Sequence, residues 1–191
     1  MKYIKILSLM AVAAAALMAF AGTASATIIE ESNGTQLLKG TQIESTGTNA
    51  VLKAGFSTVE CSHSEVDGKT SNNGGAGETV EGNINNLSFS GCNMTVTVLK
   101  KGKLIVHHTS GSNGTVTSEG AEVTVNNHSV SCTYGTTSAT NIGNLAGGSP
   151  AKLTASASLT RVAGGFLCAN PATWTATYTV TTPTSLLVTA G

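Results

Sequence analysis

Residues 173–180 read TWTATYTV, and this stretch decides the fold class. Apolar residues occupy every second position, where Trp174, Ala176, Tyr178 and Val180 alternate with threonines. Successive side chains of a β-strand point to opposite faces, so a period of two is typical of a strand with one buried and one wet face. The stretch therefore predicts a strand whose outer face is covered by threonine.

The same alternation continues through most of the chain after residue 26. Since apolar residues recur there at every second position and not at every third and fourth, no stretch has the pattern of a helix of three turns. Alternating segments of this kind lie at residues 94–98, 121–125, 130–134 and 151–159.

Short turn signals separate these segments. They predict three reversals: Lys101-Gly102 within a hairpin over residues 95–108, Asn126-Asn127 within a hairpin over residues 121–134, and Glu119-Gly120.

Many short antiparallel strands joined by Gly, Asn and Ser predict an all-β fold. We expect one domain over residues 27–191, an antiparallel β-sandwich of about ten strands with an immunoglobulin-like architecture. A closed β-barrel is the alternative. The only tryptophan, Trp174, follows the last cysteine, so the Cys…Trp…Cys spacing of true immunoglobulin domains does not occur.

The N-terminal segment has the pattern of a secretory signal peptide. Lys2 and Lys5 supply a basic start, residues 6–20 form an apolar run, and residues 24–26 read ASA. An uncleaved anchor is the alternative, but the run is short and no basic flank follows it. We therefore expect residues 1–26 to be removed, no membrane association after cleavage, and a secreted, extracellular or cell-surface protein.

The predicted export bears on whether the four cysteines form disulfides. An even number of cysteines in an oxidising compartment favours two disulfides over free thiols, and the absence of a CxxC spacing disfavours zinc. Three pairings are possible. We favour Cys61 with Cys92 and Cys132 with Cys168, because each pair then brackets its own Gly-rich segment.

The charge balance excludes several classes of partner. The 191 residues carry 10 basic and 10 acidic side chains, and only 10% of the chain is charged. A polybasic nucleic-acid binder and an acidic disordered tail are both excluded by this composition. Lys100, Lys101 and Lys103 form the only basic cluster, and no aromatic residues flank it. We therefore expect no nucleic-acid partner. The sequence also contains no complete nucleotide-binding motif, so we expect no cofactor.

Catalytic motifs are equally sparse. No GxSxG nucleophile elbow occurs, and Asp67 is the only aspartate. We therefore expect a protein that is not an enzyme. His63 or His128 converging with a serine hydroxyl and a carboxylate in one cleft would instead indicate an extracellular hydrolase.

The main polar cluster lies at residues 61–67, which read CSHSEVD. On one regular strand His63, Glu65 and Asp67 would share a face, which makes them a candidate metal or acid–base group. However, Cys61 belongs to the core, and burying three ionisable groups behind it would be costly. We therefore favour a bend after Cys61 that keeps these side chains in water.

Four threonines form a second candidate, an interaction face on one strand. A regular hydroxyl array could order water, contact ice or pack against another chain, although an ordinary wet sheet face is the simpler interpretation. The four are Thr173, Thr175, Thr177 and Thr179.

Three longer segments carry a resemblance to known proteins. They are GGAGETVEGNINNLSFSGC at 74–92, SVSCTYG at 129–135, and GGFLCANPATWTATYTV at 164–180. With the four cysteines, these segments resemble small exported, Thr- and Gly-rich proteins of soil actinobacteria. In composition the chain is also similar to the secreted apoprotein carriers of enediyne antibiotics. The resemblance implies a secreted β-rich domain and brings no activity with it.

These observations predict a secreted, non-catalytic protein with a structural or binding role at or outside the cell surface. Its partner would be extracellular or part of the cell wall, and the sequence does not fix the oligomeric state. The alternative is an extracellular carrier of a small apolar ligand. An interior cavity of roughly several hundred Å³ would favour the carrier, and a filled core the structural role.

Overall fold

A computed structural model describes residues 26–55, 57–127 and 130–191. The predicted signal peptide falls on residues outside this description, apart from Ala26. The described residues form thirteen strands and no helix, and hence no helix long and apolar enough to cross a membrane.

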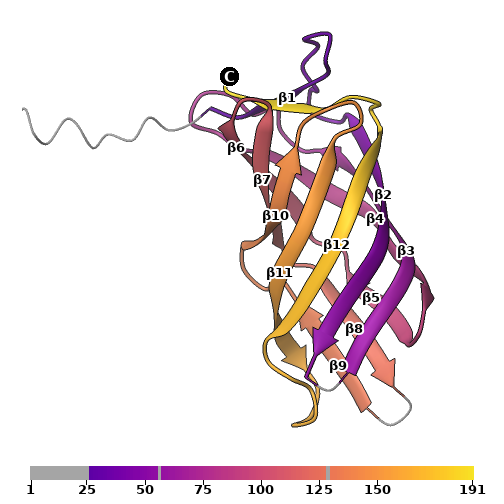
Figure 1. Cartoon of the computed structure of the whole chain (residues 1–191). Helices are drawn as coiled ribbons and strands as arrows, with labels where there is room; N and C mark the ends of the chain where they lie inside the picture. Colours follow the sequence, from indigo (N-terminus) through magenta and orange to yellow (C-terminus); the bar gives the residue numbers. More distant parts are fainter. Residues whose placement is uncertain (1–25, 56, 128–129) are drawn as a thin grey trace, which may run out of the picture.

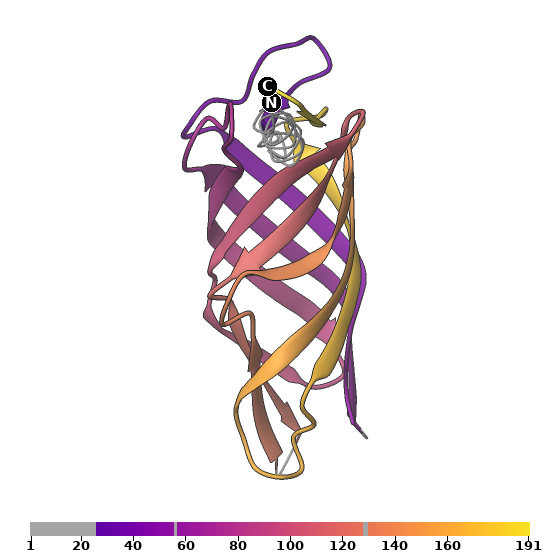
Figure 2. The same cartoon turned by 90° about the vertical axis from the view of Figure 1, so that its left-hand side faces the viewer.

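Eight of the strands pair into a closed antiparallel ring. The order around it is β2, β3, β4, β6, β7, β10, β11 and β12, after which β12 pairs with β2. The ring strands are β2 Gln42–Ala54, β3 Ser57–Thr70, β4 Val80–Cys92, β6 Lys103–Ser110, β7 Asn113–Glu119, β10 Thr140–Ala146, β11 Lys152–Ala163 and β12 Ala172–Thr182. Figures 1 and 2 show the resulting tilted barrel from two sides.

The predicted sandwich with immunoglobulin-like architecture is therefore wrong, and the barrel alternative describes the fold. The ring closes because β10 pairs with β7 along one edge and with β11 along the other. A sandwich and a barrel both bury one face of each strand, so the alternation of apolar residues is the same in both. Only these long-range pairings distinguish them.

Bulges change the alternation within the long strands. In β2, Gly47 is buried, but beyond Asn49 the buried positions are Ala50 and Leu52. Asn49 has a φ of 54°, and the register against β12 shifts at this point. A bulge inserts one extra residue and so moves the following side chains to the other face. Each half of β2 thus keeps its apolar side chains inside the barrel.

Three further strands extend one end of the barrel. β9 Val130–Gly135 pairs with the C-terminal part of β11, β8 Glu122–Asn127 pairs with β9, and β5 Thr95–Lys100 pairs with β8. The hairpin predicted over 121–134 is confirmed by the pairing of β8 with β9. The hairpin predicted over 95–108 is wrong, because β5 pairs with β8 while β6 pairs with β4 and β7. The third predicted reversal, Glu119-Gly120, lies between β7 and β8, which do not pair with each other.

A separate two-stranded sheet covers the opposite end of the barrel (Figure 1). It joins β1 Ile28–Glu30 to β13 Leu187–Thr189, near the two ends of the described chain. Ile29 of β1 and Val188 of β13 are buried. This sheet therefore closes the end of the barrel that the extension leaves free.

Both predicted disulfides are confirmed, with the favoured pairing. Cys61 and Cys92 lie directly opposite each other on β3 and β4, and Cys132 of β9 is bonded to Cys168 in the loop before β12. The described residues contain no free cysteine. Two disulfides are compatible with an oxidising, extracellular environment.

Candidate functional site

The interior of the barrel contains two adjoining cavities. One has a volume of about 130 Å³ and lies between the extension and the middle of the barrel. The other has a volume of about 110 Å³ and reaches toward the covered end. Six residues border both cavities, namely Ser45, Val66, Ile84, Leu104, Leu153 and Tyr178.

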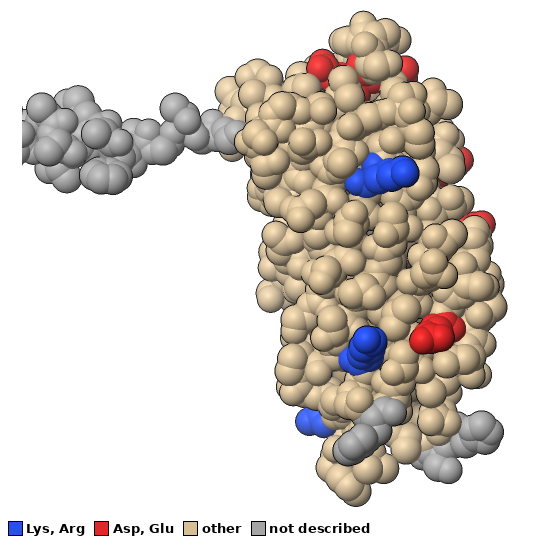
Figure 3. Space-filling model, in the orientation of Figure 1, with Lys and Arg blue, Asp and Glu red and all other residues tan. Residues whose placement is uncertain are grey.

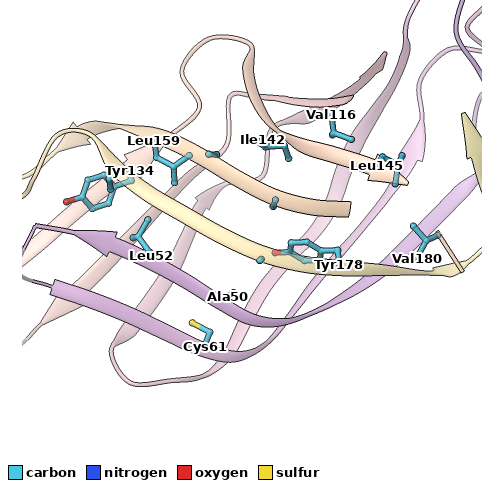
Figure 4. Packing of buried hydrophobic residues seen from close by; sticks show 14 of the residues in the cluster. Ala50, Leu52, Cys61, Val116, Tyr134, Ile142, Leu145, Leu159, Tyr178 and Val180 are labelled. Atoms are coloured by element: carbon cyan, nitrogen blue, oxygen red, sulfur yellow. The ribbon is translucent and has the colours of Figure 1, made fainter. Parts of the chain in front are cut away.

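The cavities exist because several inward positions carry small side chains. Side chains normally fill the interior of an eight-stranded barrel or leave room for one small ligand. Here the wall of the larger cavity includes Ser45, Ala50, Ser118 and Ala121 beside larger aliphatic residues. Figure 4 shows Ala50 between the side chains of Leu52 and Cys61, on strands that face Leu159 and Ile142. The lining is thus largely apolar, and both cavities are partly open to the outside.

The larger cavity also borders a seam in the barrel wall. In the described chain, β4 pairs with β6 only over Val80–Asn83, and β5 pairs only with β8. The rest of β4 and one edge of β5 thus face each other without ladder pairing, and we call this the β4–β5 seam. Leu87 and Phe89 of β4 and Val96 of β5 line the cavity from the two sides of the seam, and all three are half-buried.

Tyr178 lies where the two cavities meet. Its side chain is 2% exposed, and its ring centroid is 6.0 Å from that of Trp174. Figure 4 shows the phenol inside the barrel with its oxygen turned toward the end where Tyr134 lies. Neither the Tyr178 hydroxyl nor the buried Ser64 hydroxyl has a hydrogen-bond partner. Since buried polar groups are nearly always paired, these two hydroxyls are unusual, as are the equally buried and unpaired hydroxyls of Tyr134 and Thr189.

Register brings the two hydroxyls together over one glycine. Gly47 of β2 is opposite Ser64 of β3 on one side and opposite Tyr178 of β12 on the other. A Cβ atom at this position would lie 2.5 Å from Ser64 Oγ and 2.7 Å from Tyr178 Cε1. Gly47 therefore provides the room in which both side chains fit.

Burial also changes the acidity of the phenol. Loss of solvation raises the pKa of Tyr178 to about 12, although the nearby Ser64 hydroxyl acts in the opposite direction. Because an unfolded tyrosine has a pKa of about 10, the folded chain keeps a proton that the unfolded chain loses between these values. The resulting contribution to the free energy of unfolding is fully present below about pH 10 and is lost as the pH rises toward about 12.

This shift predicts a pH dependence of stability. Between about pH 9 and about pH 11, the wild-type protein should lose about 1 kcal/mol more free energy of unfolding than the Tyr178→Phe variant. Urea unfolding of both proteins at several pH values measures this difference. Other titrating groups are common to both proteins and cancel, so parallel pH profiles would contradict the assignment.

A second tyrosine hydroxyl, that of Tyr134, is also buried without a hydrogen-bond partner. Burial raises the pKa of Tyr134, and the positive charge of Arg161 opposes this effect. Figure 4 shows the Tyr134 oxygen turned away from Tyr178, toward the end of the barrel. The two phenols therefore occupy separate positions in the interior.

The predicted polar cluster lies on the outside of β3. Ser64 and Val66 face inward, so the alternation changes after Cys61 within an unbroken strand. His63 Nε2 is 3.1 Å from Glu65 Oε1, with both side chains nearly half exposed, while Asp67 accepts a hydrogen bond from Asn86. No group of three or more potential metal ligands occurs in the described chain. His128 lies outside the described residues.

The predicted threonine face is on the outer surface of β12. Thr173, Thr175 and Thr177 are exposed and Thr179 is half-buried. Across β11 their partners are Ser158, Ser156, Thr154 and Lys152 respectively, so the hydroxyl surface extends over two strands. Figure 3 shows few charged groups on this side of the molecule.

The basic cluster is neutralised by acidic neighbours. Lys100 Nζ is 2.7 Å from Glu122, and Lys103 Nζ is 3.3 Å from Glu119. Hydrogen bonding to Glu119 raises the pKa of Lys103. This arrangement is typical of a solvated surface.

Comparison with known proteins adds no functional assignment. No protein-family model, curated protein or solved structure matches the chain. The resemblance to exported actinobacterial proteins, and the expectation that the chain is not an enzyme, therefore stay predictions.

Proposed function

We propose that this chain is an exported, non-catalytic binding protein that carries a small apolar ligand inside its barrel. The observation that supports this role most directly is the pair of adjoining cavities at the centre of the fold, each of which is smaller than the several hundred Å³ expected for a carrier and so suits only a very small ligand. A purely structural protein would gain stability by filling this space, because each empty methyl-sized volume costs about 1 kcal/mol. A ligand would enter through the β4–β5 seam, where side chains from both strands line the larger cavity.

The size of the cavities limits the ligand to a compact molecule. A dry apolar cavity of about 150 Å³ can hold benzene, and the larger cavity here measures about 130 Å³. A single ring or a short branched chain fits this volume. Burying about 200 Å² of apolar surface contributes about 5 kcal/mol, which corresponds to a Kd of about 0.2 mM.

Toluene is a suitable probe for this proposal. Titration calorimetry should show one toluene bound per chain with a Kd of about 0.1 to 1 mM. The Ala50→Leu variant fills the larger cavity and should weaken binding at least tenfold, whereas Ala163→Leu makes the same change at an exposed position and should have no effect.

Three results would decide against the carrier role. They are the absence of toluene binding to the wild-type protein, equal binding by Ala50→Leu, and equal weakening by both variants. If Ala50→Leu is overpacked and unfolds, Ala50→Val tests the same wall with a smaller side chain and should weaken binding to a lesser degree.

A further inference from the structure

We infer that the ligand is an uncharged molecule with one hydrogen-bond acceptor, such as a ketone, ester or ether, which is held by the Tyr178 hydroxyl beside Ser64. This inference rests on the proposed function and adds the chemical class of the ligand. Tyr178 borders both cavities, and its hydroxyl and that of Ser64 are buried without partners. Ser64 borders neither cavity, so a ligand can reach only the Tyr178 hydroxyl, which a purely apolar ligand would leave unpaired.

The chain itself does not satisfy these groups. The hydroxyls of Ser64 and Tyr178 are neighbours beside Gly47, and the Ser64 hydroxyl lowers the pKa of Tyr178, but neither hydroxyl has a partner at hydrogen-bonding distance and angle. Gly47 has no side chain and contributes no polar side-chain atom. The nearby Ser45 hydroxyl already donates to the Val66 carbonyl oxygen at 3.1 Å. A polar atom from outside the chain is therefore the partner that this position lacks.

The residues that line the two cavities favour a ligand whose hydrogen-bond acceptor carries no charge. The Tyr178 phenol remains protonated at neutral pH, so it can donate a hydrogen bond. The charged residues that border the two cavities are Lys69, Glu81 and Glu122, two of which are acidic. Lys69 is an exposed residue, whereas Tyr178 is buried. A carboxylate ligand would lose its solvation without gaining a buried cation, so a neutral carbonyl or ether oxygen fits better.

Two probes of nearly the same shape separate the polar contact from the apolar fit. Cyclohexanone and methylenecyclohexane differ only in a carbonyl oxygen that is replaced by a CH₂ group. Calorimetric titration of both into the wild-type protein and Tyr178→Phe forms a double-mutant cycle in which differences in probe solvation cancel. We expect Tyr178→Phe to weaken cyclohexanone binding about tenfold, equivalent to about 1.4 kcal/mol, and to leave methylenecyclohexane within about twofold.

Two further variants locate the contact. Tyr134→Phe removes the other unpaired phenol hydroxyl at the larger cavity, which points away from Tyr178, and should leave both affinities within about twofold. Ser64→Ala removes the neighbouring hydroxyl, which borders neither cavity, and should leave both affinities within about twofold. Retained binding of methylenecyclohexane shows that each variant keeps its folded cavity.

The outcomes distinguish this inference from the proposed function. If methylenecyclohexane binds but Tyr178→Phe leaves the preference for cyclohexanone unchanged, the polar contact is wrong and the carrier role stands. Loss of the preference in Tyr134→Phe would also overturn the inference, because it would place the acceptor elsewhere. If neither probe binds the wild-type protein, the carrier role itself fails.

Discussion

A carboxylate at position 155 is expected to prevent folding, whereas the same carboxylate at position 156 should change the free energy of unfolding by less than about 0.5 kcal/mol. Ala155 is 2% exposed and its side chain faces the barrel interior. Ser156 is the next residue of β11, and its side chain is in water. The pair of variants therefore reports which face of the strand is inside.

The large cost of Ala155→Asp has a simple physical origin. A buried carboxylate without a paired cation must give up its solvation or take up a proton, and either change costs several kcal/mol, on the order of the whole stability of a domain. Soluble expression and circular dichroism of Ala155→Asp and Ser156→Asp test the prediction. Similar behaviour of the two variants would contradict the inward alternation of β11.

Substitution of Gly143 by alanine is expected to remove about 2 to 4 kcal/mol of stability, because it disturbs the strand that closes the ring. Gly143 has a φ of 150°, and it is paired with Val116 of β7 and Ala155 of β11. A Cβ atom there would lie 2.1 Å from the carbonyl oxygen of Thr154. The backbone of β11 would have to move, which weakens the pairing on which closure depends.

Gly165 provides the matched control for this substitution. It lies in the loop before β12, and a Cβ atom at this position would have no neighbour within 4 Å. Gly165→Ala should therefore change the free energy of unfolding by less than about 0.5 kcal/mol. Denaturant unfolding of both variants gives the comparison. An equally small effect at Gly143 would mean that β10 does not join β7 to β11 as described.

The sequence predicts which residues face the interior better than it predicts how the strands are arranged. Leu159 and Tyr178 are buried as their alternation indicates, because the period of two depends only on local backbone geometry. The bulge at Asn49 interrupts that period, and no composition signal marks it. The turn signal at Lys101-Gly102 is likewise insufficient to predict the topology. The turn lies between β5 and β6, but it does not determine with which strands they pair.

The candidate site depends on long-range pairing, and for this reason the sequence does not reveal it. Gly47, Ser64 and Tyr178 belong to three strands that are neighbours in the barrel, and the third is far from the other two in the chain. The alternation places Tyr178 on the inner face but gives no indication of its neighbours. By contrast, His63, Glu65 and Asp67 are close in sequence and are readily noticed, yet they lie on the outer surface.

The most direct test of the carrier role is a crystal structure of the protein exposed to xenon gas. Xenon enters dry apolar cavities large enough to hold it. We predict xenon inside the ring, in contact with Leu52, Tyr134 and Leu159 of the larger cavity. A closed barrel whose interior is filled by side chains or ordered water, with xenon bound only at the surface, would contradict the proposal.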